Sequence, residues 1–599
     1  MRWCPVASIL EKIFPILTWS KNYNADKAVS DLLSGITVGM TLIPQSMAYA
    51  SLAELGPQYG LYSSICGGFV YVLFGTIPEL HIAPTALLSL VTYSHTLHVT
   101  FGKQNAVVLL CFVAGVIELL CGILHLGFLV DFVSAPVVAA FTSAVAITVA
   151  SSQVKNLLGL QFIAETFMGA WYKIFEHIGQ IKKWDAILGL SCFIMLLFLK
   201  KIKDYGEPPF AENCGNINGK RSKIKGLLWF ISISRNVVVV GGCSLLAFFL
   251  EKSGNNVLTL TNNVPSGLPN ITLPPIEVNY EGMNFSFVEM VSQLGISVFV
   301  VPFIAVLGNV AIAKAFAKGK AMDASQEMIA LGMCNIVGSC FGSYPINASF
   351  TRGAISNATG VKTPTAGIYT GILVILSLTF LTPFFSYIPK PTLAAVVICA
   401  VLSMVEVTMT KLIWKINKID LLPFTITLLS CLLIGLEIGI IIGVCVDIIL
   451  LLHSSARPKI LFEVVMDNDV GNYIKITPTS AITFPSAEYI RERIMNYHRN
   501  ESSTEQYMVV IDCHRIHKMD FTAGKCLGAM MTDLKNNNRK VIFLEPRLKI
   551  VKVLKNVCAN DILVAETEEE LRMHLKHTKE MKLPHQEARV ESFKQVREI

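Results

Sequence analysis

Arg352 is the only charged residue between Glu327 and Lys362, and apolar and small residues surround it. A guanidinium at membrane depth costs about 2.5–3.5 kcal/mol on insertion scales, so such a side chain usually faces water or a partner. No acid lies near Arg352 in the sequence, whereas Ser349 and Thr351 place hydroxyls beside it. This grouping is typical of a site at which a mobile anion is the counter-ion. The alternative is an arginine that snorkels to the headgroups from a helix end, or that pairs with a distant carboxylate.

The composition is that of a polytopic membrane protein. Of the 599 residues, 53% are hydrophobic and 16% are charged, and the mean hydropathy is +0.55. Apolar runs of spanning length recur from Asp31 to about His453. The run Val6–Leu10 is too short for a signal peptide, so we expect the first span to act as an uncleaved anchor. The net charge of +7 does not indicate a nucleic-acid partner, because the basic residues flank the spans.

Two loops predict which side of the membrane each span end faces. Lys200–Lys225 is rich in Lys and Arg, so the positive-inside rule places it in the cytoplasm. Glu251–Glu289 is acidic and carries the sequons that begin at Asn270 and Asn284, so we expect a glycosylated extracellular or lumenal loop. Both termini are then cytoplasmic. The sequence favours the plasma membrane and leaves the lysosomal membrane open.

The spans before and after the sequon-bearing loop number about seven each, which predicts 14 spans in an inverted 7+7 repeat. Each half also holds a short, broken apolar segment, His81–Val91 in the first and Tyr344–Ser356 in the second. Proline and small residues precede a helical run too short to span. Two such half-helices facing one another would surround a central point with free N–H groups and positive dipole ends. The alternative is a pair of ordinary helices kinked by proline.

The chain divides into an N-terminal arm (1–30), a transmembrane domain (31–453), a soluble domain (458–578) and a polar tail (579–599). In the soluble domain, strands and helices alternate, which predicts a small α/β fold with a largely parallel sheet. The expected strands are Tyr473–Ile476, Tyr507–Ile511 and Lys540–Leu544, and the expected helices are Pro485–Tyr497, Thr522–Asn536, Leu548–Val557 and Thr567–Leu575.

No chemistry of an enzyme is indicated by the sequence. It lacks a phosphate-binding glycine motif, a nucleophile–base spacing and a metal-ligand cluster, so we expect no cofactor and no metal. The 15 cysteines fall mostly in apolar spans or in the soluble end, and none lies in Glu251–Glu289. We therefore interpret them as free thiols.

Longer motifs occur in both halves of the membrane domain. They are Asp31–Ala53 followed by Pro57–Ser64, then Ala83–Ala86, Gln326–Gly332, Gly338-Ser and Ser349–Arg352. Together they resemble the sulfate permease (SulP) family of anion transporters, and the soluble end resembles the STAS domain attached to them. The resemblance covers roughly residues 30–575. It implies core and gate domains within the 14-span repeat, a cytoplasmic STAS domain, a homodimer, and inorganic anions such as sulfate, chloride, bicarbonate or oxalate as substrates.

The resemblance also implies which residues bind the anion. They are Gln45 and Tyr49 in the first segment, Thr85 and Ala86 at the start of the third, and Ser349, Thr351 and Arg352 in the tenth. Each has a plainer alternative. Gln45 could make an interhelical hydrogen bond and Tyr49 could simply pack, while Ser349 and Thr351 could cap their helix.

One position departs from the family pattern. Proton-coupled sulfate carriers of this family tend to have a Glu six residues before the Lys of an AKxFA-like run. Here the run begins at Ala313, and the matching position is Gly308. No acid lies between Glu289 and Asp323, which argues against proton or sodium coupling and favours exchange or uncoupled conductance. If a proton did drive uptake, His81 and His95 would be the candidates to carry it.

Three functions remain open at this stage. They are a secondary-active anion transporter, a channel-like or voltage-sensing anion protein, and a membrane scaffold acting through its soluble domain. In that domain, the run from Asp520 to Gly524 resembles a loop that is phosphorylated in related domains, which makes Thr522 a candidate phosphorylation site. The alternative is an ordinary helix N-cap.

Overall fold

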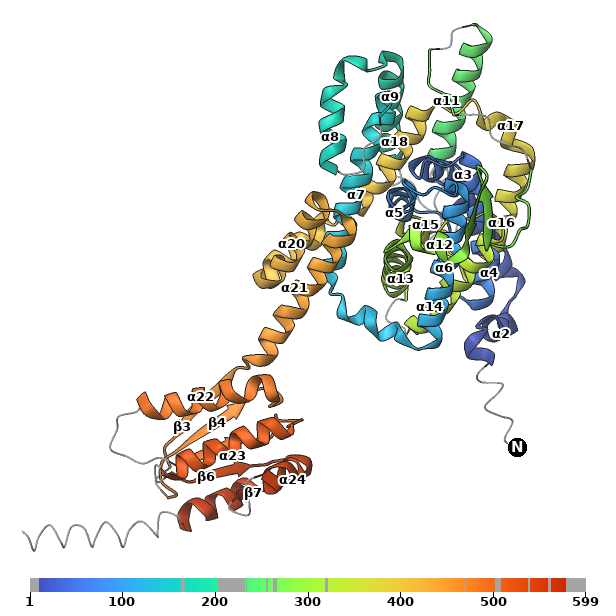
Figure 1. The fold of residues 1–599 in the computed structure, drawn as a ribbon. Coiled ribbons are helices and arrows are strands. Elements are labelled where there is room, and N and C mark those ends of the chain that lie inside the picture. Colours follow the sequence, from blue (N-terminus) through green and yellow to red (C-terminus); the bar gives the residue numbers. More distant parts are fainter. Residues whose placement is uncertain are drawn as a thin grey trace, which may run out of the picture. The chain divides into compact units, whose positions relative to one another are not determined.

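The computed structural model describes residues 10–162, 167–202, 232, 234–254, 257–261, 267–317, 322–467, 469–500, 508–536, 539–557 and 562–577. Most of Lys200–Lys225 and the tail from 578 onward lie outside these residues. The chain forms two compact units, Met1–Cys445 and Val446–Ile599, and Figure 1 shows that the first is helical and the second holds a sheet.

The first unit begins with a series of helices. They are α2 (Ile16–Trp19), α3 (Ala25–Leu52), α4 (Pro57–Phe74), α5 (Ala86–Thr96), α6 (Lys103–Ile123), α7 (Ala135–Leu157), α8 (Phe167–Glu176), α9 (Lys183–Ile202) and α11 (Arg235–Lys252), with a 3-10 turn at Leu126–Phe132. A hairpin follows, formed by β1 (Glu277–Tyr280) and β2 (Met283–Ser286). This hairpin lies within the sequon-bearing loop and was not predicted from the sequence.

The remaining elements of the first unit are again helical. They are α12 (Phe287–Leu294), α13 (Ser297–Phe316), α14 (Ala324–Ser339), α15 (Phe350–Ala358), α16 (Ala366–Leu376), α17 (Thr382–Phe385), α18 (Lys390–Val401), α19 (Val407–Ile416), α20 (Leu421–Leu433) and α21 (Leu436–Ala456), which continues into the second unit. Five helices in the described part of the chain are long and apolar enough to cross a membrane: Lys103–Ile123, Ala135–Leu157, Ser297–Phe316, Ala366–Phe385 and Ile438–Ala456.

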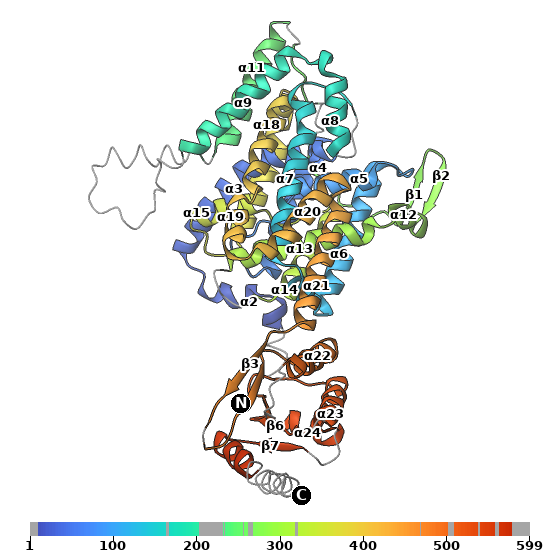
Figure 2. The same cartoon turned by 90° about the vertical axis from the view of Figure 1, so that its left-hand side faces the viewer.

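The helices of the first unit pack in two groups. In one group α14 lies against α4 and α6, α16 lies against α3 and α4, and α13 lies against α6. In the other, α7 packs against α18 and α20, and α18 also packs against α9 (Figure 2). Close approach of α6 and α14 depends on small residues, because a Cβ at Gly332 would lie 2.6 Å from the backbone nitrogen of Leu119. Contacts of α3 with α18 and α11 join the two groups.

The second unit is a five-stranded sheet with helices on both faces. Its strands, in spatial order, are β3 (Ile460–Val465), β4 (Tyr473–Pro478), β5 (Met508–Asp512), β6 (Val541–Leu544) and β7 (Leu563–Ala565), of which β4 to β7 are parallel and β3 is antiparallel to β4. The connecting helices are α22 (Phe484–Asn500), α23 (Phe521–Asn536) and α24 (Leu548–Val557), which follow one face of the sheet in Figure 2. The chain is helical again over 568–577.

Successive side chains along the parallel strands point to opposite faces of the sheet, which explains why the unit has a hydrophobic cluster on each face. Ile474, Ile476, Val509 and Ile511 belong to the core shared with α22, α23 and α24. Val510 and Ile542 point to the other face, where Leu571 and Leu575 cover them. The predicted largely parallel α/β domain is therefore confirmed, and the edge strand β3 is an addition that the sequence did not predict.

Candidate anion site

Two helices of the first unit are too short to cross a bilayer. α5 has 11 residues and α15 has 9, so each extends about 14–17 Å at 1.5 Å per residue, about half of a typical hydrocarbon core. Each follows an extended segment with a proline, Pro84 before α5 and Pro345 before α15. The broken segments predicted from the sequence are thus half-helices in the structure.

The two half-helices start beside one another. Ala83 and Asn347 form an antiparallel bridge, in which the N–H of Ala83 donates to the oxygen of Asn347 at 3.1 Å and the reverse bond measures 3.4 Å. Thr85 and Ser349 are the residues at the two helix starts, and both have extended backbone conformations. The bridge brings together residues 264 positions apart, so Thr85, Ala86 and Ser349 gather at one place (347 − 83 = 264).

The hydroxyls at these helix starts do not cap the helices. Neither Thr85 nor Ser349 makes a side-chain cap bond. Thr85 instead donates to the side-chain oxygen of Asn347 at 2.8 Å, and the hydroxyls of Ser349 and Thr351 lie 2.9 Å apart. Among the described residues, no backbone acceptor is found for the first N–H groups of α5 or α15. These N–H groups and the positive ends of the helix dipoles are available to an anion.

Arg352 joins the two extended segments. Its side chain is fully buried, and its guanidinium donates to the carbonyl oxygens of Pro84 at 2.7 Å, Ala83 at 3.0 Å, Asn347 at 3.2 Å and His81 at 3.3 Å. All four partners are neutral, and no ion pair with Arg352 occurs in the described part of the chain. Neither snorkelling nor pairing with an acid is observed. The positive charge therefore stays uncompensated at the crossing of the half-helices.

Gln45 and Tyr49 lie on α3, which packs against both α5 and α15. Both side chains are 4% exposed. The side-chain oxygen of Gln45 has no hydrogen-bond partner among the described residues, so this oxygen does not make the interhelical bond considered as the alternative. Tyr49 belongs to the buried hydrophobic core of the unit. It lies on α3 and Arg352 lies on α15, and these two helices contact one another.

Asn347 is a residue of the candidate site that sequence reasoning did not assign, and it lies beside Gly308. The asparagine figures in the sequence only as part of a sequon, but its side chain accepts the bond from Thr85. A Cβ at Gly308 would lie 2.9 Å from the amide nitrogen of Asn347. The position that the resemblance matches to the Glu of proton-coupled carriers therefore adjoins the candidate site. Here it holds no side chain.

Two buried acids, which the sequence analysis also missed, hold the segments around the site. Glu327 accepts hydrogen bonds from the phenol of Tyr71 at 2.9 Å and from the backbone N–H of Thr76 at 3.0 Å. Glu118 accepts from the amide of Asn335 at 2.8 Å, while its second oxygen has no partner among the described residues. The signal that could have identified Glu118 is the one that identified Arg352, a single charge within an apolar run, whereas Glu327 follows Asp323 by four residues and gives no such signal.

Asn335 links Glu118 to the segment that leads into α15. Its side-chain oxygen accepts from the N–H of Ile346 at 3.0 Å, and its amide approaches the oxygen of Ile346 at 3.3 Å. Ile346 precedes Asn347, so this amide fixes the backbone just before the bridge to α5. Within the described ranges, no group of three or more His, Cys, Asp or Glu side chains could hold a metal ion.

Comparison with known proteins identifies the family. Residues 29–427 match the sulfate permease family, and residues 464–573 match the STAS domain. The chain belongs to the sulfate permease family. It is 37% identical over 96% of its length to a sodium-independent sulfate anion transporter of Bos taurus, 93% of which is covered. It is 30% identical over 91% of its length to a probable sulfate transporter 4.2 of Arabidopsis thaliana, 80% of which is covered.

Solved structures share the fold. SLC26A9 superposes with a TM-score of 0.80 at 16% identity, covering 96% of this chain and 94% of that one. The transmembrane domain of the cyanobacterial bicarbonate transporter BicA gives a TM-score of 0.54 at 16% identity, covering 71% of this chain and 98% of that one. The family consists of membrane transporters, so this chain is an integral membrane protein of that kind and not an enzyme.

The predicted modification sites lie on the surface. Asn270 and Asn284 are both exposed, and Asn284 is on strand β2. Thr522 is exposed in the first turn of α23. The N-cap of that helix is Asp520, whose carboxylate accepts from the N–H of Ala523 at 2.8 Å, so Thr522 does not have the capping role considered as its alternative.

Proposed function

We propose that this chain is a secondary-active, sodium-independent exchanger of sulfate and related anions, including chloride, bicarbonate and oxalate. The observation that carries the proposal is the crossing of α5 and α15, where a fully buried Arg352 contacts four carbonyls and no acid. A buried charge without a counter-ion is unfavourable, and a bound anion relieves it. The name of the bovine relative supports sulfate as the substrate and sodium independence.

The anion would lie between the two helix starts, near the bilayer midplane. The free N–H groups of α5 and α15 would donate to it, and their dipoles would favour its negative charge. Ser349, Thr351 and Gln45 would add hydroxyl and amide donors from the surrounding helices. Arg352 would act mainly through its charge, since its donors already hold the backbone of both segments. A site made of dipoles and one charge fits several inorganic anions.

The two groups of packed helices support alternating access. We assign α3–α6 and α13–α16, which carry the site, to the core domain, and α7–α9 and α18–α21 to the gate domain. Sliding of the first group along the second would expose the site to one side and then to the other. In this proposal the unit contains 14 spans in a 7+7 inverted repeat, both termini are cytoplasmic, the protein is a homodimer, and it resides in the plasma membrane.

The coupling mode follows from Gly308. Without a carboxylate beside Asn347, the site has no group there that takes up a proton with the anion. Exchange of one anion for another is the mode that we propose, and uncoupled conductance is the alternative. The buried acids Glu118 and Glu327 accept hydrogen bonds from neighbouring helices and loops, and we assign them a structural role.

Uptake of labelled sulfate into liposomes that contain the purified chain tests this function. The expected result is saturable uptake that is stimulated by chloride, bicarbonate, oxalate or sulfate on the opposite side and does not require sodium. Large unitary chloride currents without trans-stimulation would support a channel instead. No anion flux of either kind would support a scaffold.

A further inference from the structure

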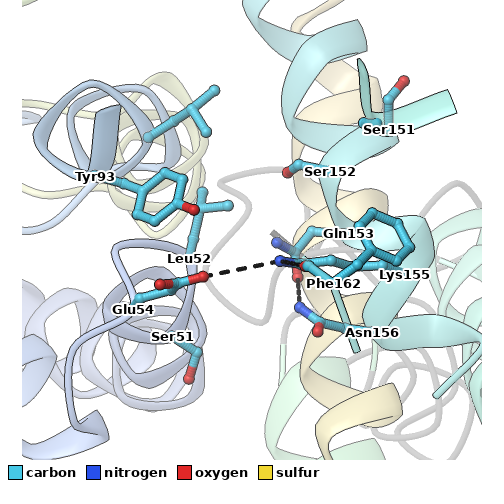
Figure 3. Close-up of a pocket in the computed structure, with 12 residues that line it drawn as sticks. Ser51, Leu52, Glu54, Tyr93, Ser151, Ser152, Gln153, Lys155, Asn156 and Phe162 are labelled. Carbon is cyan, nitrogen blue, oxygen red and sulfur yellow. Dashed lines mark hydrogen bonds and ion pairs between the residues drawn. The ribbon is translucent and has the colours of Figure 1, made fainter. Parts of the chain in front are cut away.

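Two neighbouring cavities lie between the end of α3 and the end of α7. The larger has a volume of about 920 Å³ and the smaller about 30 Å³, and Ser51, Glu54, Gln153 and Lys155 line both. Figure 3 shows Glu54 on one side and Lys155 on the other, with the two side chains directed toward one another. The carboxylate–ammonium pair therefore forms part of the wall between the cavities.

The larger cavity is lined by residues from the sequon-bearing loop and from α3, among them Thr261 and Ala48. Ala48 immediately precedes Tyr49, one of the residues predicted to bind the anion. We call this space the outer cavity, because the sequon-bearing loop is predicted to be extracellular or lumenal.

Positive charge exceeds negative charge around the outer cavity. Lys155 and Lys390 line it, and Glu54 is the one acid among its described lining residues. Glu54 forms ion pairs with two lysines: Lys103 lies 3.6 Å from one of its oxygens and Lys155 lies 3.9 Å from the other. These side chains are 21–38% exposed, so the ion pairs are weak and exchangeable. A cavity of this kind concentrates small anions.

Lys155 is anchored in a way that leaves donors free. Its ammonium donates to the carbonyl oxygen of Phe162 at 2.9 Å, and an ammonium has three donors. Gln153 accepts a bond from Asn156 through its side-chain oxygen at 3.1 Å, so its own amide N–H groups can turn to a ligand. Lys155 and Gln153 together can hold an oxyanion without losing the contact with Phe162.

Lys390 is held at the rim of the cavity by its backbone. Its N–H donates to the oxygen of Thr259 at 2.9 Å, and Thr259 is fixed in turn by two hydrogen bonds to the carboxylate of Asp185, at 2.6 and 3.0 Å. Lys390 is the first residue of α18. The backbone N–H groups of Thr392 and Leu393, which follow in this helix, already donate to the backbone oxygen of Pro389. The helix start therefore adds only its dipole, and the ammonium of Lys390 supplies the charge.

We propose that the outer cavity is a second anion-binding site, in which Lys155 and Lys390 hold a sulfate-sized oxyanion before it reaches Tyr49 and Arg352. The proposal rests on the proposed function, because it takes the transported anion as the ligand. Glu54 competes with that anion for Lys155. Since Glu54 follows α3 and Lys155 lies on α7, an anion that draws Lys155 away also loosens a link between the proposed core and gate domains. Anion arrival would thus favour opening on this side.

The test is sulfate transport by the full-length chain in liposomes, with sulfate presented either on the face that carries Asn270 or on the opposite face. The double variant Lys155→Gln/Lys390→Gln should raise the KM on the Asn270 face about tenfold, because the local anion concentration falls. Its maximal rate and its KM on the opposite face should stay within about twofold of the wild-type values. Glu54→Gln should lower the KM on the Asn270 face, because the carboxylate that competes with the anion for Lys155 is then absent.

Two further variants separate charge at this site from general effects. Lys103→Gln removes a lysine that also contacts Glu54 but does not line the cavity. The KM of this variant for sulfate on the Asn270 face should therefore change less than about twofold. The pair Lys155→Arg/Lys390→Arg keeps both charges and should retain a KM close to wild type on both faces. If Lys155→Gln/Lys390→Gln left the KM unchanged, or raised it equally on both faces, the second site would be overturned. Absence of sulfate transport in the wild-type chain would instead overturn the proposed function.

Discussion

The guanidinium of Arg352 has two roles that a single substitution tests together. Its N–H groups tie the carbonyls before α5 to that of Asn347 before α15, and in the proposed function its charge attracts the anion. A lysine keeps the charge but offers three donors from a single atom, so it does not span the same carbonyls. The same residue therefore contributes to the shape of the site and to its electrostatics.

Arg352→Lys should retain part of the transport activity, and Arg352→Ala should abolish it. The alanine variant removes the Arg352 donors from four buried carbonyls, of which Ala83 and Asn347 keep their bridge bonds, so we also expect lower abundance. Surface labelling and sulfate uptake, measured in the same cells, separate the two effects. An Arg352→Ala protein delivered to the surface with unchanged sulfate affinity and rate would contradict the anion-site assignment.

The hydroxyls of Ser349 and Thr351 should matter less than Arg352. They lie at the start of α15 without capping it. Ser349→Ala and Thr351→Ala should each cost about 1 kcal/mol of anion binding, about a fivefold rise in KM, as expected for one hydrogen bond in a hydrated site. Concentration series of sulfate uptake measure this change. No change in KM for either variant would show that the hydroxyls do not contact the anion.

Gly308 is the position at which a proton dependence could be introduced. A side chain there would start beside the amide of Asn347. Gly308→Glu should make sulfate uptake rise in acid, because protonation would remove the repulsion between its carboxylate and the anion. The matched variant Gly308→Gln should reduce uptake equally at all pH values. Wild-type uptake should show no accumulation driven by an inward proton gradient, and such accumulation would contradict the assigned coupling mode.

At the scale of elements, the local signals predicted the half-helices and the α/β domain. Pro and small residues before a short apolar run indicated α5 and α15, and Leu548–Val557 coincides with α24. The edge strand β3 was missed because it is short and none of its residues is buried, although Arg457, Pro458 and Lys459 separate it from α21. The β1–β2 hairpin was missed because its strands have only four residues each.

Contacts between distant segments were beyond sequence reasoning. The Ala83–Asn347 bridge and the carbonyl partners of Arg352 depend on how the two halves of the unit pack, which no local pattern reports. The Glu54–Lys155 pair likewise joins positions 101 residues apart (155 − 54 = 101). The sequence could single out candidates for the chemistry, such as Arg352 and Ser349. It could not show that Arg352 is held by backbone oxygens.

At the scale of the whole molecule, the sidedness of the first unit depends on the sequon-bearing loop. Asn270→Gln together with Asn284→Gln should remove a glycan mass shift and leave transport largely intact, because both side chains are exposed and neither lies in the site. Gel mobility before and after glycosidase treatment measures the shift. A full shift that persists in the double variant would mean that these loops are assigned to the wrong sides.

The central claim is that the transported anion binds between the starts of α5 and α15. The most direct measurement is an experimental structure of the protein determined with sulfate, or with the heavier analogue selenate, compared with one determined without it. The account predicts anion density within hydrogen-bonding distance of the first N–H groups of both half-helices and close to Ser349 and Arg352. Anion density elsewhere in the first unit, with the space between these helix starts empty, would contradict it.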